Sequence, residues 1–314
     1  MAERSGRRIV VTGLSTPLGR RVAERLVAHD EVETVVGIDR RSVSDRPPAV
    51  RVEVFDWNFR SLSELLADNR IDTVIHTSMS PGRSGSARLP GRANVIGTMH
   101  LSAAASARRS PVRTVVAAST SEVYPSASHS SLLHHEGEAL HPVPDSVAAA
   151  AVEAEGYLRD LQADDRRRRV SVLRLGDLAD GGTTSPLTAL LQLPLVPTVA
   201  GFDPQIQLLH GDDAAAALEH ACLTGLSGTF NIAAEGSVSW SQAARLVGRR
   251  RVVTPPFAAG RLEPLLARLR LPYGPAALVD VLRYGRCIAT DAIRATGFRT
   301  THSTADCLRL LGSS

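Results

Sequence analysis

Short β-branched runs alternate with amphipathic stretches through the first three quarters of the chain, and this alternation is the strongest constraint on its fold. The apolar runs predict strands at 8–12, 34–38, 50–55, 72–76, 113–118, 170–175 and 228–232. The stretches between them predict helices at 18–29, 61–69, 92–109, 146–163 and 212–223. Near-continuous apolar strands separated by helices predict an α/β fold, a doubly wound parallel sheet of about seven strands.

The pattern changes near the end of the chain. From residue 236 onward it becomes helical and interrupted by proline, as in "TPPFAAGRLEPLLARLRLPYGP". We therefore expect a main domain of residues 1–176 and 206–235, which holds the sheet. Residues 177–205 and 236–314 are expected to form a smaller, mainly helical lobe.

The charge balance is basic but does not indicate a nucleic-acid partner. The formal net charge is +4, and all 36 basic residues are arginine, so the chain has no lysine to use in catalysis. The arginines are scattered, and the densest run, Arg166 to Arg169, is predicted to be a solvated loop before a strand. No aromatic residues interleave this run to stack on bases, so we predict no nucleic-acid binding.

Cysteine usage and hydropathy favour a cytoplasmic protein. Cys222, Cys287 and Cys307 are odd in number and far apart, which fits neither a disulfide framework nor a metal-binding pair. The amino-terminal residues lead directly into a strand without the apolar segment of a signal peptide. No run approaches the length of a membrane span. We predict no metal site and no membrane association.

The first predicted strand continues into a glycine-containing turn and a helix, "VVTGLSTPLGRRVAERL". Gly13 and Gly19 have the spacing of the outer glycines of a loop that holds a pyrophosphate at a helix N-terminus. The middle position is Thr16, whose Cβ is expected to crowd the ligand. Thr16 also suits a helix cap and Pro17 the first helical turn, so a capped turn without ligand remains an alternative.

Asp39 strengthens the dinucleotide interpretation. It ends the second predicted strand, where a carboxylate hydrogen-bonds the ribose of adenosine and disfavours the extra phosphate of NADP. Arg40 and Arg41 follow and act in the opposite sense, so NAD is favoured over NADP without excluding it. Asp56 ends the third strand and is expected either near the adenine or in an exposed loop.

Eight sequence blocks follow one another along the chain: "VVTGLSTPLG", "GID", "DTVIHTS", "NVIGT", "VVAASTSEVY", "VSVLRLGDL", "IQLLHGDDAAAALEHA" and "GTFNIAAEGSVSWSQAARLVGR". Together, and in this order, they resemble the extended short-chain dehydrogenase/reductase family, specifically its NAD-dependent epimerase/dehydratase group. The chain looks closest to epimerase-like actinobacterial members. The resemblance implies a Rossmann-type dinucleotide-binding domain and a nicotinamide dinucleotide cofactor.

By resemblance, the cofactor's inner edge lies along the end of the fourth strand, and Thr120 hydrogen-bonds the reacting oxygen. His76 is alternatively a satisfied core histidine, and Thr120 a strand-end hydroxyl bonded to backbone. Asp212 and Asp213 are expected to cap a helix. The full predicted cofactor set is Gly13, Ser15, Thr16, Leu18, Gly19, Asp39, Arg40, Asp56, His76, Thr77, Ser78 and Asn94.

The chain departs from the family at its catalytic helix. The family carries a tyrosine and, four residues later, a lysine, and an acidic residue follows after four more. Aligned on Glu155, the tyrosine position holds Val147 and the lysine position Ala151. Asp145, Glu122 and Glu153 are candidate replacement acids, each with an alternative as a solvated carboxylate. Asp177 stands where the family has an asparagine that faces the substrate's diphosphate, which disfavours a nucleotide-sugar substrate.

Three functional hypotheses follow. The first is a NAD(P)-binding protein with a degenerate active site, weakly catalytic or non-catalytic, which also binds a small-molecule ligand. The second is an active epimerase, dehydratase or reductase that uses Thr120 and a non-standard acid/base. The third is a scaffold without ligand, should Thr16 close the loop. Family dimers form through the helices at 92–109 and 146–163, so a homodimer is predicted.

Overall fold

The computed structural model describes residues 6–40, 47–54, 57–77, 91–144, 146–179, 185–268 and 275–313. A seven-stranded sheet with strand order β12-β7-β5-β4-β1-β2-β3 is its centre, and every pairing in it is parallel. The seven predicted strands are confirmed and are all in this sheet. Their bounds are β1 (Arg7–Thr12), β2 (Val32–Asp39), β3 (Arg51–Val54), β4 (Thr73–His76), β5 (Thr114–Thr120), β7 (Arg169–Leu175) and β12 (Gly228–Ile232).

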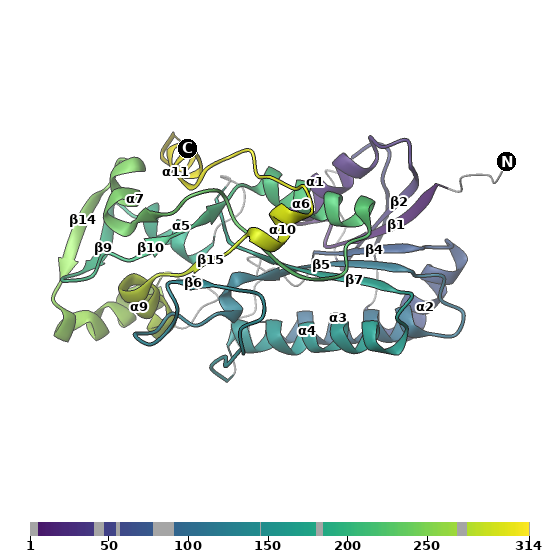
Figure 1. The fold of residues 1–314 in the computed structure, drawn as a ribbon, viewed down its shortest axis with the longest axis horizontal. Coiled ribbons are helices and arrows are strands. Elements are labelled where there is room, and N and C mark those ends of the chain that lie inside the picture. The colour runs from purple at the N-terminus through teal and green to yellow at the C-terminus, as the bar shows by residue number, and fades with distance from the viewer. Residues whose placement is uncertain are drawn as a thin grey trace.

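Helices cover both faces of the sheet (Figure 1). On one face, α1 (Pro17–Leu26) packs beside α6 (Gly211–Thr224) over an apolar core that includes Ile9, Val11 and Ile75. On the other face, α2 (Phe59–Asp68), α3 (Arg92–Ser106) and α4 (Val147–Asp164) cover a second core. Alternate residues of each strand serve the two cores, which explains the near-continuous apolar runs in the sequence.

The strand order creates a switch point beside β1. The chain winds from β1 to β2 and β3 on one side, then crosses to β4, β5, β7 and β12 on the other. Register aligns Thr12 of β1 with Ile38 of β2 and with His76 of β4, so these strands end together. Ligands of open α/β sheets bind at such a point, outside the carboxyl ends of the strands.

The remaining segments build a lobe with its own apolar core. Its helices are α5 (Pro186–Leu191), α7 (Trp240–Leu246), α8 (Leu262–Arg268), α9 (Pro275–Tyr284) and α11 (Thr304–Ser313). It also holds a parallel two-stranded sheet that the sequence pattern did not predict, β9 (Leu195–Val199) with β14 (Arg250–Thr254). Ile206 and Leu208 belong to this core although the predicted boundary lies at residue 205. The domain boundaries themselves stay a prediction.

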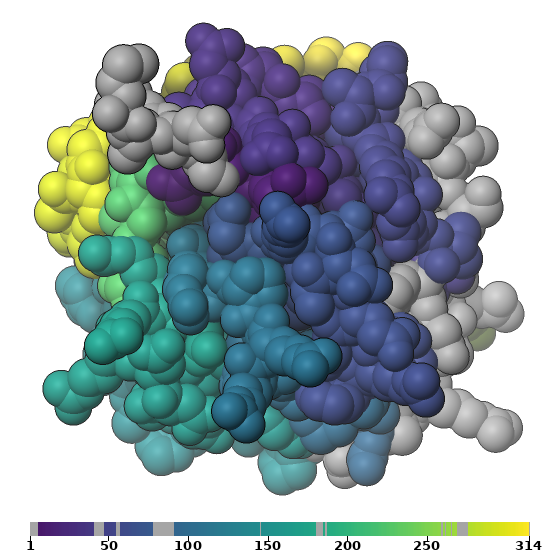
Figure 2. All heavy atoms as spheres, turned by 90° about the vertical axis from the view of Figure 1, so that its right-hand side faces the viewer, coloured from purple at the N-terminus to yellow at the C-terminus, as the bar shows by residue number. Residues whose placement is uncertain are grey.

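Short strand pairs lie outside these two sheets. They are β6 (Leu133–His134) with β15 (Cys287–Ile288), β8 (Asp177–Leu178) with β11 (Leu208–Leu209), and β10 (Gln205–Ile206) with β13 (Val238–Ser239). Figure 2 shows the side of the molecule that lies on the right in Figure 1, where β1 begins. The coloured surface there comes mainly from the first half of the chain, drawn in purple to teal. Within the described ranges, no helix combines the length and apolar character needed to cross a membrane.

The prediction that Arg166 to Arg169 form a solvated loop is wrong for Arg168. Its side chain is buried, and its guanidinium donates to the carbonyls of Leu161 in α4 (2.9 Å) and Ala105 in α3 (3.2 Å). The last carbonyls of a helix have no partners within it, so this one cation caps two helices. A charge run read from sequence alone does not reveal which of its members turns inward.

Candidate functional site at the carboxyl edge of the sheet

The β1–α1 turn has the geometry that its glycines require. Gly13 adopts a left-handed φ of +72°, and its N–H donates to the Ile38 carbonyl at 3.1 Å. A Cβ on Gly19 would lie 2.3 Å from the Gly13 carbonyl oxygen and 3.1 Å from Thr77 Oγ1. Only glycine therefore allows α1 to begin so close to the turn and to the end of β4.

The side chain of Thr16 is hydrogen-bonded inside this turn. Its hydroxyl donates to the Gly13 carbonyl at 2.7 Å and accepts from the Gly19 N–H at 3.0 Å, which makes it the N-cap of α1. The predicted cap and the proline in the first turn are both confirmed. Because the hydroxyl is directed into the turn, it takes one N–H that a glycine-rich loop would offer to a phosphate. Leu18 contributes its side chain to the core below.

Asp39 fixes the same turn from β2. Its Oδ2 accepts from the Ser15 N–H at 2.9 Å, and the side chain is buried at 8% exposure. The Asp39 carboxylate, predicted to bind the ribose, therefore lies beside the β1–α1 turn, while Arg40 next to it is exposed. Asp56, Ser78, Asp145 and Arg41 lie outside the described residues.

His76 is held between β1 and α3. Its Nδ1 lies 2.8 Å from Thr12 Oγ1, its Nε2 lies 2.9 Å from Thr98 Oγ1, and the ring is fully buried. Burial lowers the pKa of His76 to about 4, so the imidazole is neutral. These contacts agree with the alternative that His76 is a core histidine whose ring nitrogens are both hydrogen-bonded. Thr77 is also buried, and its hydroxyl donates to the Thr12 carbonyl at 2.6 Å. Asn94 lies in the first turn of α3, where its carbonyl accepts from Thr98.

Thr120 ends β5 and caps the short helix η1 (Ser121–Val123). Its hydroxyl accepts from the Glu122 N–H at 3.2 Å and lies 3.4 Å from Glu122 Oε1. Next to η1, Ala151 of α4 is 5% exposed and packs in an apolar cluster with Val123 and Tyr124. Val147, one turn earlier, is 8% exposed. Val147 and Ala151, at the positions that the sequence alignment predicts for the family's tyrosine and lysine, are thus both buried apolar side chains.

A buried ionic network lies beneath these positions. Glu155 pairs with Arg174 of β7, with 2.7 Å between Oε2 and Nη2, and also accepts from the Ser119 hydroxyl at 2.6 Å. Arg174 Nη1 donates to the Tyr124 hydroxyl at 2.8 Å, which donates to Asn231 at 2.8 Å. Burial acts to lower the pKa of Arg174, but the Glu155 hydrogen bond and charge outweigh it and raise the pKa. Burial likewise raises the pKa of Tyr124.

Sequence reasoning missed the role of Tyr124 and Asn231. Tyr124 ends the "STSEVY" block and Asn231 lies in the predicted strand "GTFNI", so both positions were visible in the sequence. Their contacts run across 107 residues of chain. A polar residue inside an apolar strand was the signal, because a buried amide needs partners. At 1% and 0% exposure, neither residue reaches solvent.

Asp177, at the asparagine position of the family turn, is neutralised within the chain. Arg286, just before β15, donates from Nη2 to Asp177 Oδ2 at 3.4 Å, and both side chains are buried at 8% and 6% exposure. The pair is electrically neutral. Asp177 therefore does not present the uncompensated carboxylate on which the argument against a diphosphate rested.

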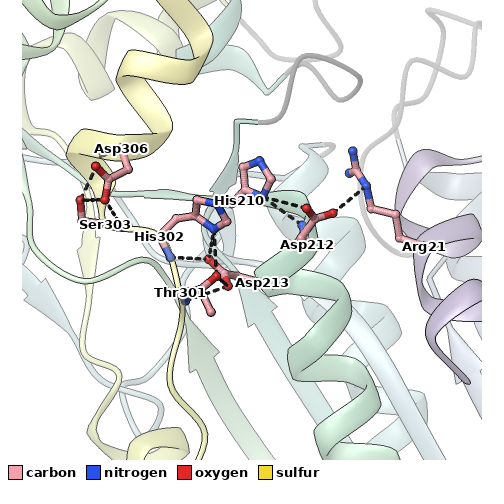
Figure 3. A network of polar contacts seen from close by, with 8 residues as sticks. All are labelled: Arg21, His210, Asp212, Asp213, Thr301, His302, Ser303 and Asp306. Atoms are coloured by element: carbon pink, nitrogen blue, oxygen red, sulfur yellow. Dashed lines mark hydrogen bonds and ion pairs between the residues drawn. The ribbon is translucent and has the colours of Figure 1, made fainter. Parts of the chain in front are cut away.

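The capping role predicted for Asp212 and Asp213 is wrong. His210 is the N-cap of α6, and its ring accepts from the Asp212 N–H. Asp213 instead accepts from Thr301 and from the N–H and ring of His302, near the carboxyl end of the chain (Figure 3). Asp212 pairs with Arg21 of α1 at 3.1 Å. A carboxylate in the first turn of a helix can accept hydrogen bonds from other segments instead of from the N–H groups of that turn. For Asp213 the donors lie in a segment distant in the sequence.

Other site chemistries lack support in the described part of the chain. It contains no group of three or more His, Cys, Asp or Glu side chains able to hold a metal ion. All three cysteines are buried and none forms a disulfide, and burial raises the pKa of Cys222 to about 12 and of Cys287 to about 11. A cavity of about 30 Å³ beside Thr290 and Phe298 has room for little more than water.

Solved structures share this fold over almost its whole length. UDP-N-acetylglucosamine 4-epimerase from Bacillus cereus has a TM-score of 0.71, with 19% identity over 98% of this chain and 99% of that one. dTDP-glucose 4,6-dehydratase from Bacillus anthracis, solved in complex with NAD, has a TM-score of 0.72, with 14% identity over 98% and 96% of the two chains. At these identities the likeness shows the fold alone.

Sequence relatives are closer. An uncharacterized protein of Mycobacterium tuberculosis and one of Mycobacterium bovis are each 34% identical over 300 residues, which is 91% of this chain and 78% of theirs. The profile described as "NAD dependent epimerase/dehydratase family" matches residues 9–179, from β1 through α4 to β8. The chain therefore belongs to the NAD-dependent epimerase/dehydratase family.

Proposed function

We propose that this protein binds NAD(H) at the carboxyl edge of its sheet and lacks the family's standard catalysis, which makes it weakly catalytic or non-catalytic. The observation that carries the proposal is the burial of Val147 and Ala151, at 8% and 5% exposure, at the positions aligned with the family's tyrosine and lysine. A positioned acid/base contributes about 10² to 10⁴ in rate. Nothing at these two positions can move a proton.

The residues present fit the adenosine half of a dinucleotide. Gly13 and Gly19 keep the tight turn against the start of α1, and Asp39 lies beside it with its carboxylate on the Ser15 N–H. Asp39 would hold the ribose hydroxyls, and the first turn of α1 would receive the pyrophosphate. The Thr16 hydroxyl takes the Gly19 N–H, so we expect weaker phosphate binding than a glycine at this position would allow. When bound, the nicotinamide supplies hydride transfer.

The test is a titration of the protein with NADH and then NADPH, followed by nicotinamide fluorescence. We expect micromolar NADH affinity, weaker NADPH affinity, and a loss of about tenfold or more in Asp39→Ala because a charged hydrogen-bond acceptor is removed. Asp39→Asn is a second variant, since its amide oxygen still accepts from Ser15 while its charge is gone. Asp160→Ala, an exposed carboxylate on α4, is the matched control. If neither nucleotide binds, the scaffold hypothesis replaces this one.

One observation favours residual catalysis as a second candidate. The Thr120 hydroxyl lies 3.4 Å from the half-buried Glu122 carboxylate, so a hydroxyl and a base are adjacent at the end of β5. Glu153, the other described candidate acid, is exposed on α4. NAD-coupled turnover of an alcohol or sugar substrate that is lost in Glu122→Gln, with folding intact, would establish this second candidate. Turnover unaffected by both Glu122→Gln and Thr120→Ala would exclude this pair.

A further inference from the structure

Strand β14 leaves a backbone edge open at the far end of the lobe. It is the outer strand of its two-stranded sheet, and among the described residues it pairs only with β9 (Figure 1). The Ala200 N–H donates to the Thr254 carbonyl at 2.9 Å, so the backbone polar groups of Thr254 are directed toward β9. The backbone N–H and C=O groups of successive strand residues point to alternate sides. Those of Arg250 and Val252 therefore also point toward β9, and those of Arg251 and Val253 point outward.

Apolar side chains accompany this edge. Val253 is 59% exposed and Val252 is 41% exposed, on opposite faces of the strand. Phe257, in the helical turn η2 (Pro256–Arg261) that follows, is 91% exposed, and Leu195, the register partner of Arg250, is 53% exposed. Isolated exposed apolar residues are ordinary, but a group of four around an open strand edge marks an interaction surface.

The same edge carries an excess of positive charge. Arg249, Arg250 and Arg251 are consecutive and exposed, and no carboxylate of the described residues lies within ion-pair distance of them. Asp203 acts electrostatically on Arg251, but one carboxylate does not balance three guanidinium groups. A partner that covers this edge must therefore bring its own negative charge.

We propose that the β14 edge binds an extended acidic segment of another protein, which adds a strand beside Arg251 and Val253 and places carboxylates near Arg249 to Arg251. A second copy of this chain is disfavoured, because edge-to-edge pairing would bring six arginines together. A membrane surface is disfavoured, because the outward N–H and C=O groups would lose hydrogen bonds against lipid. An added acidic strand would hydrogen-bond the outward N–H and C=O groups and would balance the charge of the arginines. The proposal is independent of cofactor binding.

Fluorescence anisotropy with labelled, end-capped peptides tests this directly. The probe is a peptide of about eight residues, the usual length of a strand, that alternates glutamate and valine. One comparison peptide alternates lysine and valine. The other is the acidic peptide with N-methylated valines, which keeps charge and side chains but cannot pair as a strand. We expect the acidic probe alone to bind, with an affinity that falls as salt rises.

Variants assign the binding to the edge. Val253→Pro removes an outward N–H without removing one from the β9 ladder, and we expect it to weaken binding by about tenfold or more. The charge reversal Arg250→Glu with Arg251→Glu should do the same, while Arg109→Glu, exposed after α3, should change nothing. Thermal melting verifies that each variant folds.

Four outcomes would overturn the proposal. They are equal binding of the N-methylated peptide, equal binding of the lysine peptide, no binding of any peptide, and acidic-peptide binding that folded Val253→Pro retains. Two further measurements identify other occupants. Co-sedimentation with anionic vesicles that is lost in Phe257→Ser would assign the face to a membrane, and self-association that is lost in Val253→Pro would assign it to a second copy.

Discussion

At the scale of single residues, the Glu155–Arg174 pair is the most consequential contact. Both side chains are 5% exposed or less, so removal of one partner leaves a buried charge uncompensated. We expect Glu155→Met to lower the free energy of unfolding by about 3–5 kcal/mol, as measured by urea denaturation. The double variant Glu155→Met with Arg174→Met should recover part of this loss, because it leaves no buried charge. A double variant as unstable as the sum of the singles would contradict this account.

The sequence identifies these residues but not their pairing. Glu155 was visible as the family acid used for the alignment, and Arg174 lies in the quoted block "VSVLRLGDL" within a predicted strand. Their contact depends on how α4 lies across β7, which no local spacing determines. For the same reason the sequence predicts Val147 and Ala151 at the tyrosine and lysine positions, but it does not reveal that Ala151 packs with Val123 and Tyr124.

At the scale of elements, Arg168 supports the carboxyl ends of α3 and α4 together. Replacement by methionine keeps the apolar stem and removes the cation, and we expect a loss of about 2 kcal/mol because two helix-end carbonyls lose a charged donor. Arg167→Met is the matched control, since Arg167 is exposed and surface changes usually cost within about 0.5 kcal/mol. Urea denaturation of both variants decides, and equal losses would refute the capping role.

The attachment of the carboxyl-terminal segment to α6 should depend on pH. Burial acts to raise the pKa of Asp213, but hydrogen bonds from Thr301 and His302 outweigh it and lower the pKa. The pKa of Asp213 is therefore depressed in the folded state. Its contribution is complete above the unfolded value of about 3.9 and is lost as pH falls through the folded value. We measure the free energy of unfolding by urea denaturation between about pH 6 and about pH 3. As pH falls, it should decrease less in Asp213→Asn than in the unaltered protein. Parallel curves would contradict it.

Strands of the central sheet were predictable because their apolar runs are continuous. The β9–β14 sheet was not, since β9 contains Pro197 and β14 begins with two arginines. Alternation explains how proline fits there: residue 198 faces β14, so position 197, which lacks an N–H, faces away from it. The Pro197 carbonyl then accepts from the buried Trp240 indole at 2.8 Å. Such compensation is tertiary and leaves no local signal.

At the scale of the whole molecule, we expect a homodimer through α3 and α4. Ile96 on α3 is 43% exposed, and Val152 and Tyr157 on α4 are only half-buried, so an apolar surface remains on these helices. Light scattering at micromolar concentration should give twice the chain mass of 33.4 kDa. Ile96→Glu should restore the single mass, while Ile96→Met should not. A single-chain mass for the unaltered protein would exclude this dimer.

The hydrogen-bond order around His76 determines where its one proton resides. The Thr98 hydroxyl spends its only hydrogen on the Asn94 carbonyl, at 2.8 Å, so it can only accept from His76. The neutral ring is therefore the Nε2–H tautomer, and Nδ1 accepts from the Thr12 side. The hydrogen bonds run from His76 through the Thr98 hydroxyl to the Asn94 carbonyl. A backbone carbonyl has no proton to donate, so no proton can be passed along this path. His76 therefore has no proton path outward through Thr98.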